Sequence, residues 1–171
     1  MTCLDLSEID WSREYAVAVA AVRDAAEAIK RFYDAMDAEV YTKADDSPVT
    51  DADLASDRIL RTHLTSAFPG DAILTEEVAD DPARLGAPRL WLADPLDGTQ
   101  QFINRTGKFD VFLALIVGGR PVVAAIAPAE RTCAEAIAGH GAWYDAGEGS
   151  QRLRVPTLNG ADVQRSARTT T

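Results

Sequence analysis

An apolar run that stops abruptly at an acid–proline pair constrains the fold of this chain more than any other feature. Leu90 to Ala93 has the composition of a short buried strand, and Asp94-Pro95 follows it directly. Proline has no N–H to donate and pushes the preceding residue toward extended geometry. We therefore expect the strand to end with Asp94 at its tip. Asp97 then lies on a turn, and Thr99 begins a short helix.

The same segment offers oxygen ligands and unpaired amide groups within six residues. Hard divalent cations prefer oxygen, which the carboxylates of Asp94 and Asp97 and the Leu96 carbonyl provide. Gly98 lets the backbone approach a ligand, and a helix starting at Thr99 directs free N–H groups at an anion. A bare Asp-Gly-Thr indicates only a turn. The whole hexapeptide after an apolar strand indicates a metal-assisted phosphate site.

Two further acidic elements lie upstream. Residues 72–75 form a short apolar run, and Glu76-Glu77 follow where a strand should end. A solvated acidic turn is the alternative for this pair, because Asp80-Asp81 come next. Thr50 and Asp53 fit a capping box at the start of a predicted helix. That structural role alone would explain Asp53.

Apolar periodicity predicts the remaining elements. Apolar side chains recur at steps of three and four between Ile9 and Met36, and a second helix is expected from Asp51 to Ala67. An acidic loop is expected at 37–46, with Lys43 in solvent; the alternative is that Lys43 reaches the phosphate site. Strands are expected at 72–75, 90–93, 111–117, 122–127, 132–137 and 153–155. The sequence thus predicts an α+β or layered α/β fold, with two long N-terminal helices packed on a largely antiparallel sheet.

Composition limits the classes of partner. With 171 residues, 47% of them hydrophobic, the chain can bury the core of one domain. A net charge of −10 argues against nucleic acid or anionic membrane as partner, whereas metal ions would reverse the local sign for an anionic substrate. Cys3 and Cys133 have no metal or redox spacing, so we expect a reduced, cytoplasmic chain. We expect no signal peptide and no membrane span.

Three blocks in order resemble the inositol monophosphatase family of Mg²⁺-dependent, lithium-sensitive phosphomonoesterases. They are 49–53 (VTDAD), 76–77 (EE) and 94–99 (DPLDGT), and the similarity runs from about Lys43 to Trp143. Residues 43–50 and 102–109 resemble the bacterial 3'(2'),5'-bisphosphate nucleotidase branch, which converts adenosine 3',5'-bisphosphate, a by-product of sulfate assimilation, to AMP. Departures at Gln100-Gln101, Lys108 and Phe112 leave an inositol or sugar phosphatase of the same family as the alternative.

The resemblance implies a ligand set for two or three Mg²⁺ ions. Glu76 and Asp94 would bind the first ion together with the Leu96 carbonyl. Asp97 would join Asp94 around a second ion. Glu77 would be an outer acid of the metal site.

The resemblance also implies how a small phosphorylated substrate is held and attacked. Substrate contacts would come from five residues, namely Glu76, Leu96, Asp97, Gly98 and Thr99. Asp53, acting through the Thr99 hydroxyl, would orient and deprotonate the attacking water. Water would then attack in line, without a covalent phosphoenzyme.

The domain organisation follows from the same resemblance. Residues 1–158 would be the metal-binding N-terminal domain of a sugar-phosphatase-type sandwich, with 159–171 as a tail. The C-terminal domain of the family, which supplies another metal-binding Asp, has no counterpart after Trp143. We therefore expect weak or no activity from this chain alone and a tendency to form a homodimer. A non-catalytic, metal-binding remnant is the alternative from another class.

Overall fold

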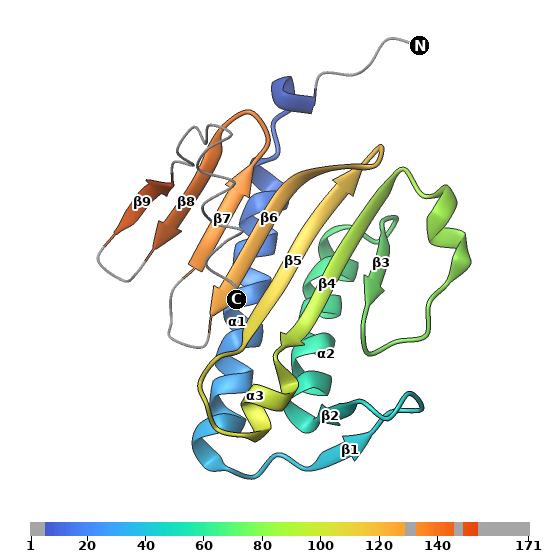
Figure 1. Cartoon of the computed structure of the whole chain (residues 1–171). Coiled ribbons are helices and arrows are strands. Elements are labelled where there is room, and N and C mark those ends of the chain that lie inside the picture. The colour runs from blue at the N-terminus through green and yellow to red at the C-terminus, as the bar shows by residue number, and fades with distance from the viewer. Residues whose placement is uncertain (1–5, 129–132, 146–148, 154–171) are drawn as a thin grey trace, which may run out of the picture.

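The computed structural model describes residues 6–128, 133–145 and 149–153, which build a helical layer on a sheet (Figure 1). The helices are α1 (Ser12–Ala35), α2 (Asp51–Ala67), the short α3 (Thr99–Ile103) and the 3-10 turns η1 (Leu6–Glu8) and η2 (Pro82–Gly86). The strands of the main sheet are β3 (Ala72–Thr75), β4 (Arg89–Asp97), β5 (Asp110–Val117), β6 (Arg120–Pro128), β7 (Cys133–Ile137), β8 (Gly141–Asp145) and β9 (Ser150–Leu153). A separate hairpin pairs β1 (Val40–Thr42) with β2 (Pro48–Thr50).

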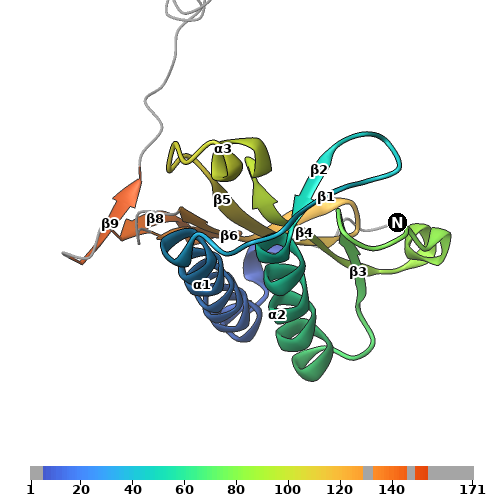
Figure 2. The same cartoon turned by 90° about the horizontal axis from the view of Figure 1, so that it is seen from below.

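The main sheet runs in sequence order from β3 to β9, and each described pair is antiparallel except β3 with β4. Figure 2 shows α1 and α2 side by side on one face of this sheet. The face that α1 turns to the sheet carries small residues at helical spacing, which lets helix and strands approach closely; these are Ala18, Ala21, Val22, Ala25 and Ile29. The predicted fold of two long helices on a largely antiparallel sheet is confirmed.

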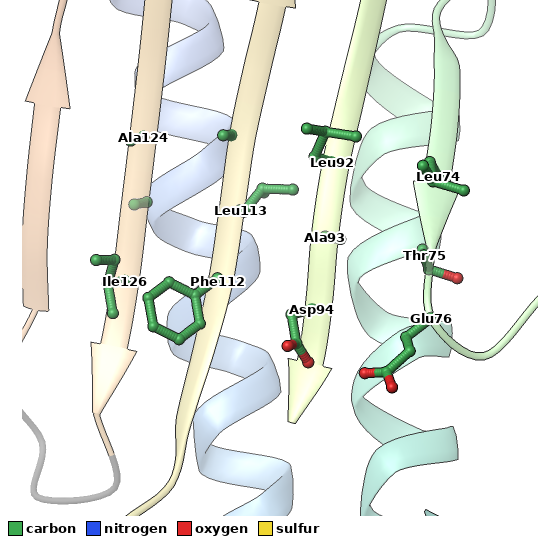
Figure 3. A pocket seen from close by; sticks show the side chains of 12 residues that line it. Leu74, Thr75, Glu76, Leu92, Ala93, Asp94, Phe112, Leu113, Ala124 and Ile126 are labelled. Atoms are coloured by element: carbon green, nitrogen blue, oxygen red, sulfur yellow. The ribbon is translucent and has the colours of Figure 1, made fainter. Parts of the chain in front are cut away.

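The opposite face of the central strands is also apolar. Along β5 the buried residues Val111, Leu113 and Leu115 alternate with less buried ones such as Phe112. Among the described residues, Leu92, Phe112 and other apolar side chains line a hollow of about 540 Å³ on this face (Figure 3). One end of the hollow reaches the acidic ends of β3 and β4.

The structure corrects four sequence-based expectations. Residues 37–46 were expected to be a loop, but Val40–Thr42 pairs with Pro48–Thr50, because a turn stabilised by main-chain hydrogen bonds closes a hairpin there. β4 continues irregularly to Asp97, which pairs with Asp110 after a register shift. β8 was not predicted as a strand. The expected edge at 153–155 begins earlier, at Ser150, and 154–171, including the predicted tail, lie outside the described residues.

Arg89 joins α1 to the sheet through two carboxylates. Its Nε atom lies 2.9 Å from Asp71 Oδ1, and its Nη2 atom donates a 2.9 Å hydrogen bond to Glu14 on α1. The guanidinium group also faces the rings of Trp11 and Phe68. A single side chain therefore holds α1, the start of β3 and β4 together.

We expect Arg89→Met to lower the free energy of unfolding by about 3 kcal/mol, because it leaves two partly buried carboxylates without their cation. The matched control is Arg84→Met, which removes an exposed pair with Asp80 and should cost about 0.5 kcal/mol or less. Urea unfolding of both variants measures the difference. Equal small losses would mean that Arg89 does not hold the layers together.

Candidate active site

Two strand ends bring the first predicted metal ligands side by side. β3 and β4 are parallel, and Thr75 pairs with Ala93. Glu76 and Asp94 therefore follow at the same edge of the sheet, where Figure 3 shows their carboxylates next to each other. The parallel pairing is the physical reason that residues 18 positions apart in sequence share one site.

Asp94 sits in a strongly negative environment. Burial raises its pKa to about 6, and the neighbouring charges of Glu76 and Asp97 add to the rise. A 3.2 Å hydrogen bond from the Leu96 N–H to Asp94 Oδ1 opposes it. A cation bound beside Asp94 would therefore reduce the repulsion between Asp94 and these two neighbouring carboxylates.

The turn after Asp94 presents one backbone carbonyl to the site. The Pro95 carbonyl accepts a 2.6 Å hydrogen bond from Ser56 Oγ, and the Leu96 side chain is buried in the core. These two anchors fix the peptide that carries the Leu96 carbonyl. Its oxygen lies 3.3 Å from Thr99 Oγ1, so it faces the start of α3. This is the carbonyl that the family resemblance assigns to the first metal ion.

Asp53 is a helix cap and a partner of Thr99 at the same time. Its Oδ2 atom accepts a hydrogen bond from the Thr50 backbone N–H (2.8 Å), as in the capping box of α2, and a second from Thr50 Oγ1 (2.5 Å). Its Oδ1 atom accepts a 2.9 Å hydrogen bond from Thr99 Oγ1. The side chain is 1% exposed. The structural and the functional interpretations of Asp53 are therefore compatible, because each uses a different carboxylate oxygen.

Gly98 is required where the chain turns into α3. Its φ of +95° lies in the left-handed region, and a Cβ atom there would be 2.9 Å from the Lys108 carbonyl. Thr99 then begins α3, as predicted. Asp97, the remaining predicted ligand, is exposed and pairs in register with Asp110.

Glu77 and Lys43 form an ion pair that the sequence did not predict. Lys43 Nζ lies 3.0 Å from Glu77 Oε1 and 3.6 Å from Glu76 Oε1, and the lysine side chain is only 22% exposed. The expectation of a solvated Lys43 is therefore corrected. Burial raises the pKa of Glu77, and the charge of Lys43 opposes that rise. No local signal could have shown this contact, since 34 residues separate the partners.

The oxygen donors of this edge suit a hard cation. Within the part of the chain that the structure describes, no three His, Cys, Asp or Glu side chains already form a cluster ready to hold a metal. The predicted first ligand set instead combines Glu76 and Asp94 with a backbone carbonyl, all of them oxygen donors. The type of donor atom, rather than a preformed cluster, is therefore what suits this edge to a divalent ion.

Sequence comparison decides the family. The inositol monophosphatase family model matches residues 10–170. The chain belongs to the inositol monophosphatase family. It is 44% identical over 108 residues to the 3'(2'),5'-bisphosphate nucleotidase CysQ of Salmonella typhimurium, covering 61% of this chain and 43% of that protein. It is also 38% identical over 81 residues to the histidinol-phosphatase of Chlorobaculum parvum, covering 47% of this chain and 30% of that protein.

Solved structures agree with this assignment. CysQ from Bacteroides thetaiotaomicron, a bacterial member of the inositol monophosphatase family, superposes with a TM-score of 0.73 at 27% identity, covering 92% of this chain and 68% of that one. The extragenic suppressor protein SuhB from Bartonella henselae gives a TM-score of 0.75 at 28% identity, covering 86% and 56%. The predicted family and fold are confirmed. The chain spans less than half the length of these curated CysQ relatives.

Proposed function

We propose that this chain carries the metal and phosphate site of a Mg²⁺-dependent phosphomonoesterase that hydrolyses adenosine 3',5'-bisphosphate to AMP and phosphate. The observation that carries the proposal is the arrangement at one edge of the sheet. Glu76 and Asp94 lie side by side there, and Thr99 donates to the buried Asp53. The similarity to proteins named 3'(2'),5'-bisphosphate nucleotidase supports the substrate class.

Each of the predicted ligands would have its own place around the metal ions. Glu76, Asp94 and the Leu96 carbonyl would hold the first of two or three Mg²⁺ ions, Asp97 would join Asp94 at the second, and Glu77 would act as an outer acid. Bound Mg²⁺ supplies charge neutralisation of the phosphate and a water of lowered pKa.

Thr99 and Asp53 prepare the nucleophile. The Thr99 hydroxyl donates a hydrogen bond to Asp53 Oδ1, so it can take a proton from the attacking water while its own proton passes to the Asp53 carboxylate. Asp53 is 1% exposed and bonded at both oxygens, so it is fixed in place as the base of this dyad. Gly98 and Thr99 would hold the phosphate oxygens at the start of α3, beside Glu76, Leu96 and Asp97.

Two other functions compete. An inositol or sugar phosphatase of the same family is favoured by the departures at Gln100-Gln101 and by the similarity to a histidinol-phosphatase, which is named for a different phosphate monoester. A non-catalytic metal-binding remnant is the alternative from another class. Metal binding alone does not separate these functions, whereas turnover does.

The test is phosphate release by the purified 171-residue chain with Mg²⁺, from adenosine 3',5'-bisphosphate and from inositol 1-phosphate. Asp94→Asn is the blank. If the chain completes its site, we expect weak release from the bisphosphate above the blank. Preference for inositol 1-phosphate would move the chain to the other branch, and no release from a folded chain would support the remnant.

The setting of the reaction is part of the proposal. No helix among the described residues is long and apolar enough to cross a bilayer, and Cys133 is a buried free thiol. We propose a cytoplasmic protein acting on a small phosphorylated substrate rather than on a nucleic acid polymer. The homodimer stays a prediction, as does the domain division at residue 158.

A further inference from the structure

A lysine of the β1–β2 hairpin lies against the acidic edge of the site. Its ammonium group contacts Glu77 at 3.0 Å and Glu76 at 3.6 Å. Glu77 is 5% exposed and Lys43 22% exposed, so surrounding atoms hold both partners of the closer pair in place. Glu76 is 59% exposed and free to turn toward another cation. Glu76 thus contacts Lys43 and is also a proposed direct ligand of the first metal ion.

The hairpin fixes the base of this lysine. The Lys43 N–H donates a 2.8 Å hydrogen bond to the Ser47 carbonyl, and the Asp46 N–H donates to the Lys43 carbonyl at 3.1 Å. The strand that leaves this turn ends at Thr50, which caps α2 and bonds to Asp53. The backbone of Lys43 is therefore tied to the same structure that positions the Asp53–Thr99 pair, and only its long side chain has freedom to move.

We propose that Lys43 is a displaceable counter-ion of the metal site. Its ammonium group neutralises Glu76 and Glu77 in the metal-free chain, and it gives up Glu76 when a divalent cation binds there. The inference rests on the proposed metal-binding role of Glu76. Two cations at neighbouring carboxylates repel each other, so Lys43 lowers the affinity for metal while it keeps the acidic edge in place without metal. Glu77 retains the ammonium group in both states.

The first test measures Mg²⁺ binding by isothermal titration calorimetry. We expect Lys43→Gln to bind Mg²⁺ about tenfold tighter than the unaltered chain, because a repelling charge is gone. Lys43→Arg keeps the charge and should bind like the unaltered chain. The matched control is Lys30→Gln, which removes the same charge from an exposed pair with Asp34 on α1 and should change nothing. Equal or weaker binding by Lys43→Gln would overturn the proposal.

Asp94→Asn distinguishes this inference from the function on which it rests. If Asp94→Asn binds Mg²⁺ as well as the unaltered chain does, the metal site itself is wrong, and the role of Lys43 fails with it. If Asp94→Asn loses binding while Lys43→Gln and the unaltered chain bind equally, the metal site holds and only the inference about Lys43 fails.

If Lys43→Gln does not fold, the proposal can still be tested on the unaltered chain. The sequence contains three lysines, at positions 30, 43 and 108, so ¹³Cε labelling of lysine gives three signals. Loss of one signal in Lys43→Arg identifies that of Lys43. Saturation with Mg²⁺ should shift the Lys43 signal and leave that of Lys30 in place. A Lys43 signal that does not change at saturating Mg²⁺ would contradict displacement.

Discussion

Asp94→Asn is expected to reduce phosphate release to background and, without metal, to make the chain more stable at pH 7. Activity falls because the carboxylate that would serve both metal ions loses its charge. Stability rises because burial, Glu76 and Asp97 raise the pKa of Asp94 to about 6, so its ionised form is disfavoured in the folded chain. The residue is only partly buried, and after allowance for solvent screening we expect a gain of about 1 kcal/mol.

The predicted gain in stability of Asp94→Asn depends on pH. The pKa of Asp94 is above its unfolded value of 3.8. The protonated carboxyl group therefore stabilises the folded chain below pH 4, and this contribution is lost as the pH rises through about 6. The stability advantage of Asp94→Asn in EDTA should therefore be absent at pH 4 and complete above pH 7. Thermal unfolding across this range measures it. Asp34→Asn, on the surface of α1, is the control, and identical pH profiles for the two variants would contradict the prediction.

Asp53→Asn is expected to lower phosphate release by about 100-fold or more while the chain stays folded. The asparagine oxygen can still accept from the Thr50 N–H, so the cap of α2 persists. The amide nitrogen then faces Thr99 and donates where the carboxylate accepted. The hydrogen bond is reversed, and the Thr99 hydroxyl no longer has a base to receive its proton.

Initial rates of phosphate release and thermal unfolding, measured on the same preparations, separate the two roles of Asp53. The matched control is Asp51→Asn, which removes the same charge from the same turn of α2. Asp51 bonds to the Glu39 N–H and the Tyr41 hydroxyl rather than to Thr99. Its variant should keep near-full activity. Equal activity in the two variants would mean that Asp53 is a helix cap and nothing more.

Much of this architecture was predictable, because its signals are local. The helix from Asp51 to Ala67 begins at a capping box and ends before a Pro-Gly pair, so sequence and structure agree on both boundaries. The apolar runs of β3 and β5 and the short helix at Thr99 were likewise identified by composition and turn residues. Glu76 and Asp94 follow directly after the paired residues of β3 and β4, as the apolar runs before them predicted.

The features that were not predicted depend on contacts distant in sequence or on weak local patterns. The strand at Val40–Thr42 is three residues long and exposed, so it has no apolar alternation to reveal it. β4 passes beyond Asp94 because Asp97 pairs with Asp110, a partner on another strand. Lys43 was expected in solvent because its acidic partners lie more than thirty positions away. Sequence patterns reveal contacts between residues that are close along the chain, whereas these features depend on contacts between residues that are distant in sequence.

The double use of Asp53 changes what a sequence of this kind can reveal about activity. A relative that had lost its chemistry would still gain from an acid at this position, because α2 needs its cap. Asp94 differs from Asp53, because its negative charge lowers the stability of the metal-free chain. Drift without selection for metal binding would remove it early. In truncated or divergent copies, a retained Asp94 is therefore the informative mark of a working site, and a retained Asp53 is not.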